Sequence, residues 1–257
     1  METEGVIKIL NMANKKEHFT KVPNDFIRGD IKTNYGVSRK FYIIYILIDR
    51  YRSYENYSWI TVKKIFEFYG YKTLRKDSKA FREVLDVLEF MEANCMIEIY
   101  QDLNTITIDT GIEIKILSEN FDYDHNFTKL TSSQLDAIMS FDSSANRENI
   151  LITFLYVSSY IGCSQNDDSL KPAAFYKSLT QMAVELGMSK KTINQCLEYL
   201  TESNKTHNSL LIKREVKNIK QNNSQLPKSY PNIYVLNLPG YQQEIELAMK
   251  QITLFEI

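Results

Sequence analysis

The chain has 257 residues, 44% hydrophobic and 25% charged, with a formal net charge of −1. This length allows one large domain or two of medium size, and the near-neutral charge excludes a uniformly basic chain, so any nucleic-acid binding would need a local basic surface. No apolar run approaches the length of a membrane span, and the N-terminus lacks the basic-then-apolar order of a signal peptide. We therefore expect a cytoplasmic protein that does not enter a membrane.

The three cysteines, Cys95, Cys163 and Cys196, lie far apart and form no CxxC pair. None of them has metal-ligand spacing with a histidine. The pattern predicts reduced, buried thiols and no metal site.

The first half of the chain predicts a succession of elements. "KFYIIYILIDRY", beginning at Lys40, is an apolar helix, and "TVKKIFEFYGY" from Thr61 is a short helix that ends near Gly70. Apolar residues at intervals of three and four then predict an amphipathic helix, and "CMIEIYQDLNTITID" (95–109) predicts a β-hairpin. The inward face of that helix is expected to comprise Phe81, Val84, Leu85 and Leu88. Trp59 is expected to be a packed core indole.

The segment 70–84, "GYKTLRKDSKAFREV", carries a net charge of +3. Its basic residues suit contact with phosphates, whether they lie on a loop or on the following helix. Such a contact needs a side chain long enough to reach the DNA backbone, but it does not need an exact position on a helix. The basic residues are Lys72, Arg75, Lys76, Lys79 and Arg82.

Residues 98–148 are acidic, with a net charge of −7. The first hairpin contains no Lys or Arg, so we expect a sheet edge or a protein-contact surface there rather than a DNA contact. The polar stretch 118–126 has no periodic run and is expected to be a linker. It would separate an N-terminal domain, residues 1–117, from a C-terminal domain, residues 127–257.

The second half repeats the first. "FTKLT" begins at Phe127, 108 residues after "FTKVP" begins at Phe19, and the same interval matches Arg147 to Arg39. "ENILITFLYVSSY" follows as an apolar helix, "SLTQMAVELGM" from Ser178 as a short helix, and "LLIKRE…PNIYVLN" as a hairpin. Several matches in the same order predict an internal duplication.

"SLTQMAVELGMSKKTINQCLEYL" contains helix start and stop signals. Ser178 and Gln181 form a capping box, Gly187 closes the short helix, and Ser189 caps the next one. The inward positions of this second helix are Ile193, Cys196, Leu197 and Leu200. Its outward positions are Lys190, Lys191, Asn194 and Gln195. Two ammonium groups and two amides at the start of a helix suit phosphate and base contact, and the alternative is an ordinary solvated face.

The second hairpin is basic along its strands and connection. Its cations are Lys213, Arg214, Lys217, Lys220 and Lys228. Such a loop can follow a phosphate backbone, and the alternative is a polar hairpin tip.

Short helix, glycine turn, basic helix and hairpin together resemble a winged helix-turn-helix. Two such units in one chain are similar to the tandem winged-helix replication initiators of plasmids and phages, of the Gram-positive type. The resemblance implies a mainly α fold with small β-hairpins (α+β), built from two tandem winged helix-turn-helix domains related by duplication. It implies that the basic residues named above, together with Ser189, Asn194 and Gln195, contact DNA.

The expected function is sequence-specific binding of double-stranded DNA by an initiator that binds repeated origin sites and recruits host replication proteins. A transcriptional or segregation regulator with the same domains is the alternative, and a homodimer remains open. A scaffold that has lost DNA binding is an alternative of another class. No nucleotide-binding loop or catalytic triad spacing occurs in the sequence, so we expect no enzyme activity and no cofactor.

Overall fold

The computed structural model describes residues 18–70, 75, 78–117, 127–140, 146–161, 174–202, 209–215, 231–237 and 241–254. These residues form helices and three small antiparallel sheets, which confirms the mainly helical α+β class. The expected linker 118–126 lies outside them. We call residues 18–117 the N-terminal half and residues 127–254 the C-terminal half.

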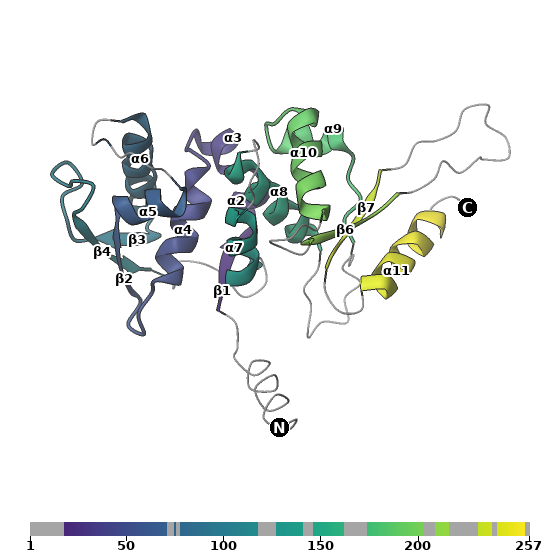
Figure 1. Ribbon diagram of the computed structural model, residues 1–257, viewed down its shortest axis with the longest axis horizontal. Helices are drawn as coiled ribbons and strands as arrows, with labels where there is room; N and C mark the ends of the chain where they lie inside the picture. The colour runs from purple at the N-terminus through teal and green to yellow at the C-terminus, as the bar shows by residue number, and fades with distance from the viewer. Residues whose placement is uncertain are drawn as a thin grey trace, which may run out of the picture.

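The N-terminal half begins with a strand and two short helices, which are followed by a long apolar helix (Figure 1). A three-stranded sheet and two more helices complete it. Its elements are β1 (Phe19–Pro23), α2 (Asn24–Arg28), α3 (Ile31–Tyr35), α4 (Lys40–Arg50), β2 (Tyr57–Thr61), α5 (Val62–Phe68), α6 (Lys79–Ala93), β3 (Ile97–Ile99) and β4 (Gly111–Ile116).

The C-terminal half also begins with a strand, and it ends with a helix that packs on strand β7. Its elements are β5 (Phe127–Thr131), α7 (Ser132–Ser140), α8 (Arg147–Tyr160), α9 (Leu179–Glu185), α10 (Lys190–Thr201), β6 (Leu211–Arg214), β7 (Ile233–Leu236) and α11 (Tyr241–Leu254).

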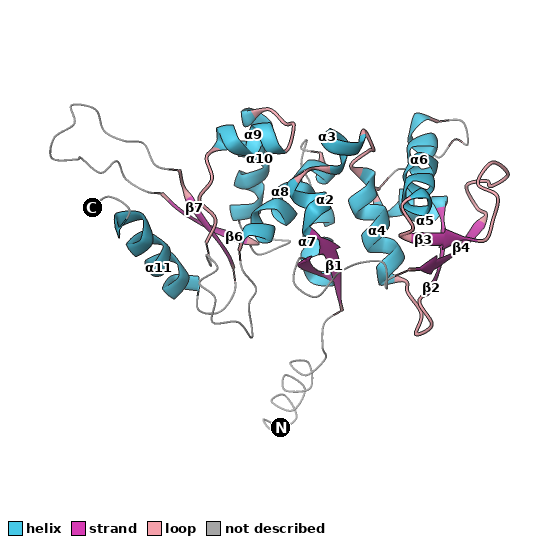
Figure 2. Cartoon of the chain, turned by 180° about the vertical axis from the view of Figure 1, so that it is seen from behind, coloured by secondary structure: helices cyan, strands magenta, loops and turns pink. Residues whose placement is uncertain are grey.

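The same order of elements occurs in both halves. A buried helix is followed by an extended segment, a short helix, a longer helix and a hairpin. The N-terminal sheet has the strand order β2-β4-β3, and in the C-terminal half β7 pairs with β6 on one side and with Phe175 on the other. The last strand of each half, β4 or β7, is therefore central in its sheet. The two sheets lie at opposite ends of an elongated molecule (Figure 2).

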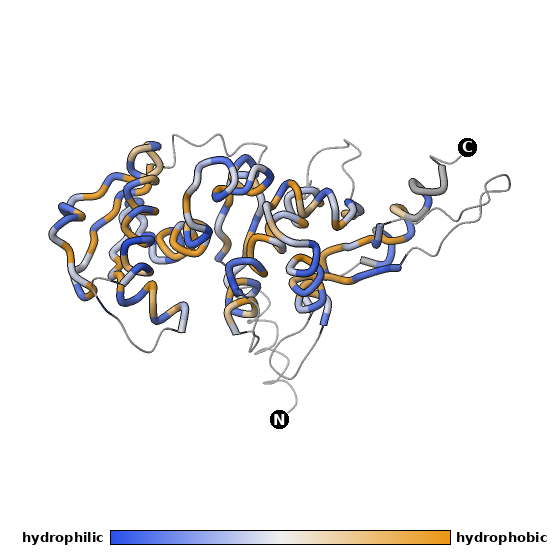
Figure 3. The backbone as a smooth tube through the Cα atoms, turned by 90° about the horizontal axis from the view of Figure 1, so that it is seen from above, coloured by the Kyte–Doolittle hydropathy of each residue, from blue (hydrophilic) through white to orange (hydrophobic). Residues whose placement is uncertain are grey.

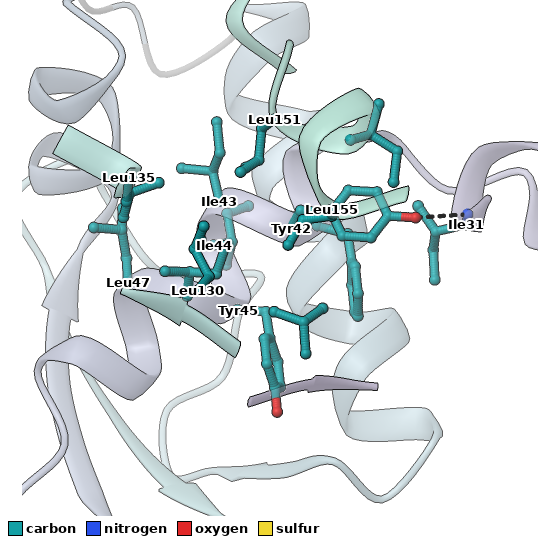
Figure 4. Packing of buried hydrophobic residues seen from close by; sticks show 14 of the residues in the cluster. Ile31, Tyr42, Ile43, Ile44, Tyr45, Leu47, Leu130, Leu135, Leu151 and Leu155 are labelled. Carbon is teal, nitrogen blue, oxygen red and sulfur yellow. Dashed lines mark hydrogen bonds between the residues drawn. The ribbon is translucent and has the colours of Figure 1, made fainter. Parts of the chain in front are cut away.

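The centre of the molecule is formed by α4 and α8, which are buried around their whole circumference. Every residue from Lys40 to Ile48 in α4 and from Ile150 to Ser159 in α8 is buried. Such helices need cover on all sides, and residues of both halves provide it in one continuous apolar cluster (Figure 4). By contrast, hydrophobic and hydrophilic residues alternate along β2 and β4 of the N-terminal sheet, as expected for strands with one buried face (Figure 3).

Strands β1 and β5, the two segments with matching sequences, pair with each other across the middle of the chain. The pairing is antiparallel and joins Lys21 to Lys129, which are counterparts at the interval of 108. The ammonium of Lys21 lies 4.6 Å from the ring centre of Phe127, and that of Lys129 lies 5.2 Å from the ring centre of Phe19. This small sheet is therefore locally two-fold symmetric.

Two expectations for the N-terminal half were wrong. Trp59 is 63% exposed, because β2 alternates and directs Ser58 and Ile60 inward, leaving the indole to cover Gly111 on the outer face. The hairpin does form, but its second strand is 111–116 and not the run "TITID". "GIEIKI" alternates apolar and polar residues, whereas the preceding stretch forms turns that bury single residues such as Ile106.

The buried hydroxyl of Tyr42 joins α4 to the two short helices. It accepts a hydrogen bond from the backbone N–H of Ile31 at 3.1 Å and donates one to the carbonyl of Phe26 at 2.8 Å. Burial raises the pKa of this phenol far above its ordinary value, so it remains protonated and able to donate.

Tyr42→Phe removes this hydroxyl while keeping the ring. We expect the free energy of unfolding to fall by about 1–3 kcal/mol, because a buried N–H and a buried carbonyl lose their partner. Urea denaturation measures the loss. Tyr54→Phe, at a fully exposed tyrosine, is the matched control and should change stability by less than about 0.5 kcal/mol. Equal effects of the two substitutions would contradict the assignment.

Candidate nucleic-acid interface

The α9–α10 segment forms the helix, turn and helix that its sequence predicts. Ser178 and Gln181 complete a reciprocal capping box at the start of α9. Gly187 has a φ of 55°, which an L side chain rarely adopts, and Ser189 caps α10 by accepting a hydrogen bond from the backbone N–H of Thr192. The turn is thus fixed by local chemistry, and these cap predictions are confirmed.

Helix α10 has one buried and one exposed face. The four predicted inward residues, Ile193, Cys196, Leu197 and Leu200, are buried. Burial raises the pKa of the Cys196 thiol to about 11, so Cys196 is a neutral packing residue. The prediction of buried thiols is wrong for Cys95, which is exposed in the turn after α6, and Cys163 lies outside the described residues.

The exposed face of α10 presents the predicted polar residues. Lys190, Lys191, Asn194 and Gln195 are all exposed. The side-chain amide of Asn194 donates to the carboxylate of Glu198 at 2.7 Å. Glu198 was not among the predicted residues, although its spacing of four from Asn194 on a helix could have indicated it. The contact orients the amide while its oxygen keeps acceptor capacity.

The α5–α6 segment of the N-terminal half is the counterpart. Thr61 caps α5, Gly70 has a φ of 76°, and Ser78 caps α6. The connection from α5 to α6 is longer than the one from α9 to α10. Among the predicted cations, Arg75, Lys79 and Arg82 are exposed near the start of α6, whereas Lys72 and Lys76 lie outside the described residues.

The basic hairpin of the C-terminal half is described only in part. Lys213 and Arg214 are exposed on β6, and the ammonium of Lys213 lies 3.0 Å from the carboxylate of Glu215. The other predicted cations of this hairpin, Lys217, Lys220 and Lys228, lie outside the described residues.

The starts of α6 and α10 lie along one edge of the molecule, at the top of Figure 1, with α3 between them. We call this the upper edge. Helix α3 adds exposed Lys32 and Asn34, which were not predicted as site residues. A side-chain Cβ at Gly187 would lie 2.7 Å from the hydroxyl of Thr33, so α3 closely approaches the α9–α10 turn. The short stretch between Gly29 and Gly36 lacked the periodicity that would have revealed a helix.

Acidic residues belong to the N-terminal sheet and its connection, near the left end of Figure 1. Asp102 and Asp109 lie in the β3–β4 connection, and Glu98 and Glu113 lie on the two strands. The ammonium of Lys63 is 3.2 Å from the carboxylate of Asp109. The sheet and its connection thus carry four carboxylates, two of which are paired with Lys63 and Lys115, whereas the exposed cations of the predicted site lie at the upper edge.

A cluster of polar side chains braces α9 against α8. Glu185 accepts hydrogen bonds from the hydroxyl of Tyr156 at 2.6 Å, from that of Tyr160 at 3.1 Å, and from the ammonium of Lys177 at 2.8 Å. Burial opposes ionisation of Glu185, but these hydrogen bonds lower its pKa below the ordinary glutamate value. Burial and the carboxylate raise the pKa of Tyr156 strongly, so its phenol is no poised nucleophile.

Within the described residues, no group of three or more His, Cys, Asp or Glu side chains could hold a metal ion. No helix in the same part of the chain is both long and apolar enough to cross a membrane. A scan against protein-family models found no match, and a search of curated proteins also found none.

The Lys177–Glu185 contact should make the free energy of unfolding fall as the pH becomes acidic. Because the pKa of Glu185 is lowered in the folded state, its contribution is present above the unfolded glutamate pKa of about 4.3 and is lost as the pH falls further. The difference in unfolding free energy between the wild type and Glu185→Gln should therefore shrink below about pH 4.3. Denaturant titrations at several pH values measure it.

Glu89→Gln, which removes an exposed carboxylate from α6, is the charge-matched control. A wild-type advantage over Glu185→Gln that stays constant down to about pH 3 would show that ionised Glu185 does not brace α9.

Proposed function

We propose that the chain consists of two winged helix-turn-helix units and binds double-stranded DNA in a sequence-specific manner. In each unit the longer helix, α6 or α10, is the recognition helix. The observation that carries the proposal is that both helices expose cations at their N-terminal ends along a single edge. Recognition helices present their N-terminal residues to the major groove, so this end is the one that needs cations and amides.

The topology supports this assignment. A helix, an extended segment, two further helices and a hairpin, with the last strand central in the sheet, occur in both halves. The hairpins then correspond to the wings. The C-terminal wing exposes Lys213 and Arg214, whereas the N-terminal one carries Asp102 and Asp109. We infer that the C-terminal wing lies along the phosphate backbone and that the N-terminal one stays away from it.

The relation of the two halves also supports duplex binding. Because β1 and β5 pair with a two-fold symmetric register, we infer that the halves that they begin are disposed about an approximate two-fold axis. Duplex DNA has two-fold axes of its own, and operator symmetry reflects protein symmetry. We infer that one chain reads two half-sites of opposite orientation.

Among DNA-binding roles, we propose initiation of plasmid or phage replication at repeated origin sites. The sequence resemblance to tandem winged-helix initiators supports this choice, and host replication proteins would be further partners. A regulator of transcription or segregation is the second candidate, because a two-fold arrangement of recognition helices equally suits an inverted repeat in a promoter. Replication of a plasmid that carries the gene and its flanking repeats, tested with and without an intact reading frame, distinguishes the two.

Lys190→Ala/Lys191→Ala tests the recognition edge. We expect duplex affinity to fall, and the slope of log affinity against log salt to decrease by about 2, because each lost phosphate contact changes the slope by about 0.9. Fluorescence anisotropy over a salt series, on a duplex selected from a random pool, measures both quantities.

The charge-matched control is Lys115→Ala/Lys250→Ala, on β4 and α11. It removes two cations away from the upper edge and should leave the slope nearly unchanged. If the wild type binds no duplex, or binds with no salt dependence, a protein-interaction scaffold explains the chain better.

Asn194→Ala tests base reading. We expect a loss of about 1–3 kcal/mol on the preferred site and a smaller loss on a site changed at one base pair, because a bidentate amide contact discriminates by this amount. The salt slope should remain that of the wild type. A uniform loss on all sequences would instead assign Asn194 to the backbone or to the stability of α10.

A further inference from the structure

Two counterpart arginines cross between the halves. Arg147, in the C-terminal half, donates from Nη1 to the backbone carbonyl of Tyr69 at 3.1 Å. Arg39, in the N-terminal half, donates from Nη2 to the backbone carbonyl of Leu186. Each half thus bonds to the other at matching positions, since Arg39 and Arg147 are 108 residues apart.

The two acceptors occupy the same place in their units. Tyr69 is the C-cap of α5 and Leu186 is the C-cap of α9, and each is followed directly by a glycine with positive φ. The last carbonyls of a helix lack helical partners and carry its negative dipole end, so a guanidinium stabilises them. Both arginines therefore hold the turn from which a recognition helix continues.

The surroundings suit a fixed guanidinium in each case. Arg39 forms a two-pronged ion pair with Asp30, which is 0% exposed, and donates to the side-chain oxygen of Asn149 at 3.2 Å. A Cβ at Gly70 would lie 3.3 Å from Nη1 of Arg147, so the missing side chain allows the close approach. Planar guanidinium groups held in this way lose little freedom when they bond.

A third contact beside them obeys the same symmetry. The ammonium of Lys40 lies 3.0 Å from the carboxylate of Glu148, and these two residues are counterparts as well. Together with the pairing of Lys21 and Lys129, it places the arginine contacts around one approximate two-fold axis.

We propose that Arg39 and Arg147 are positioning residues that fix the separation and orientation of α6 and α10, and thereby the spacing between the two DNA half-sites that the chain accepts. The inference rests on the proposed function for its DNA part. Neither arginine needs to touch DNA, since each acts through the turn of the opposite half.

Arg147→Ala is the principal variant. Unlike a substitution of Arg39, it leaves the buried carboxylate of Asp30 paired. Binding is measured on duplexes in which the selected half-sites are separated by spacers that change one base pair at a time. The wild type should prefer one spacer. The variant should lose about tenfold on that spacer, retain its affinity for an isolated half-site, and accept neighbouring spacers almost equally.

Arg50→Ala is the matched control. Arg50 also pairs across the halves, with Asp136 at 2.7 Å, but it lies at the far end of α4 and contacts neither turn. It should keep the wild-type spacer preference. Arg147→Lys, which keeps the charge without the planar fork, serves if Arg147→Ala fails to unfold cooperatively, and it should broaden the preference in the same direction.

A second measurement requires no DNA. Fluorophores attached at positions 89 on α6 and 202 after α10 report the distance between the helices by single-molecule energy transfer. The distribution should widen in Arg147→Ala and stay narrow in Arg50→Ala. A wild type that binds no duplex would refute the proposed function while the distance distribution still decides the positioning role. A variant with an unchanged distribution and an unchanged spacer preference would overturn the inference.

Discussion

The arrangement depends on the burial of α4 and α8, two helices with almost no polar face. Helix α4 packs against α6, β1 and β2 of its own half and against α8, and α8 packs against α7, α10 and β5 of its own half and against α2 and α4. Burying this apolar surface provides the main stabilising free energy, at about 25 cal/mol per Å². The two halves therefore do not pack as independent units, because separating them would expose apolar residues of this shared cluster.

Polar contacts add direction to this non-directional association. An apolar interface tolerates sliding, but the hydrogen bonds of Arg39 to Leu186 and of Arg147 to Tyr69, together with the pairing of β1 with β5, fix one arrangement of the halves. Buried polar contacts add little net stability, because desolvation offsets them, and we infer that these contacts mainly fix the arrangement of the halves. The hydrophobic core thus brings the halves together, and the polar contacts determine how α6 and α10 are disposed.

Local signals in the sequence predicted local structure well. The capping box at Ser178, the turn at Gly187 and the buried face of α10 follow from side-chain chemistry within a few residues, and all three are present. Failures occurred where partners distant in sequence decide the outcome. The outward position of Trp59 depends on the pairing of β2 with β4. The two arginine hydrogen bonds span 78 positions of the sequence for Arg147 and Tyr69, and 147 positions for Arg39 and Leu186. The repeat suggested that Arg39 and Arg147 correspond, but periodicity cannot reveal that each one reaches into the other half.

The near-zero net charge is consistent with DNA binding once the placement of charge is considered. In the interior, Arg39 is paired with Asp30 of its own half and Lys40 with Glu148 of the other half. At the upper edge, Lys79, Lys190 and Lys191 are exposed. The carboxylates of the N-terminal sheet would repel phosphate, so a duplex gains only when it approaches the cationic edge. A dipolar charge distribution of this kind orients the encounter while limiting non-specific affinity. Under the proposed function, selectivity comes from the geometry between α6 and α10, which is the property that the crossed arginines control.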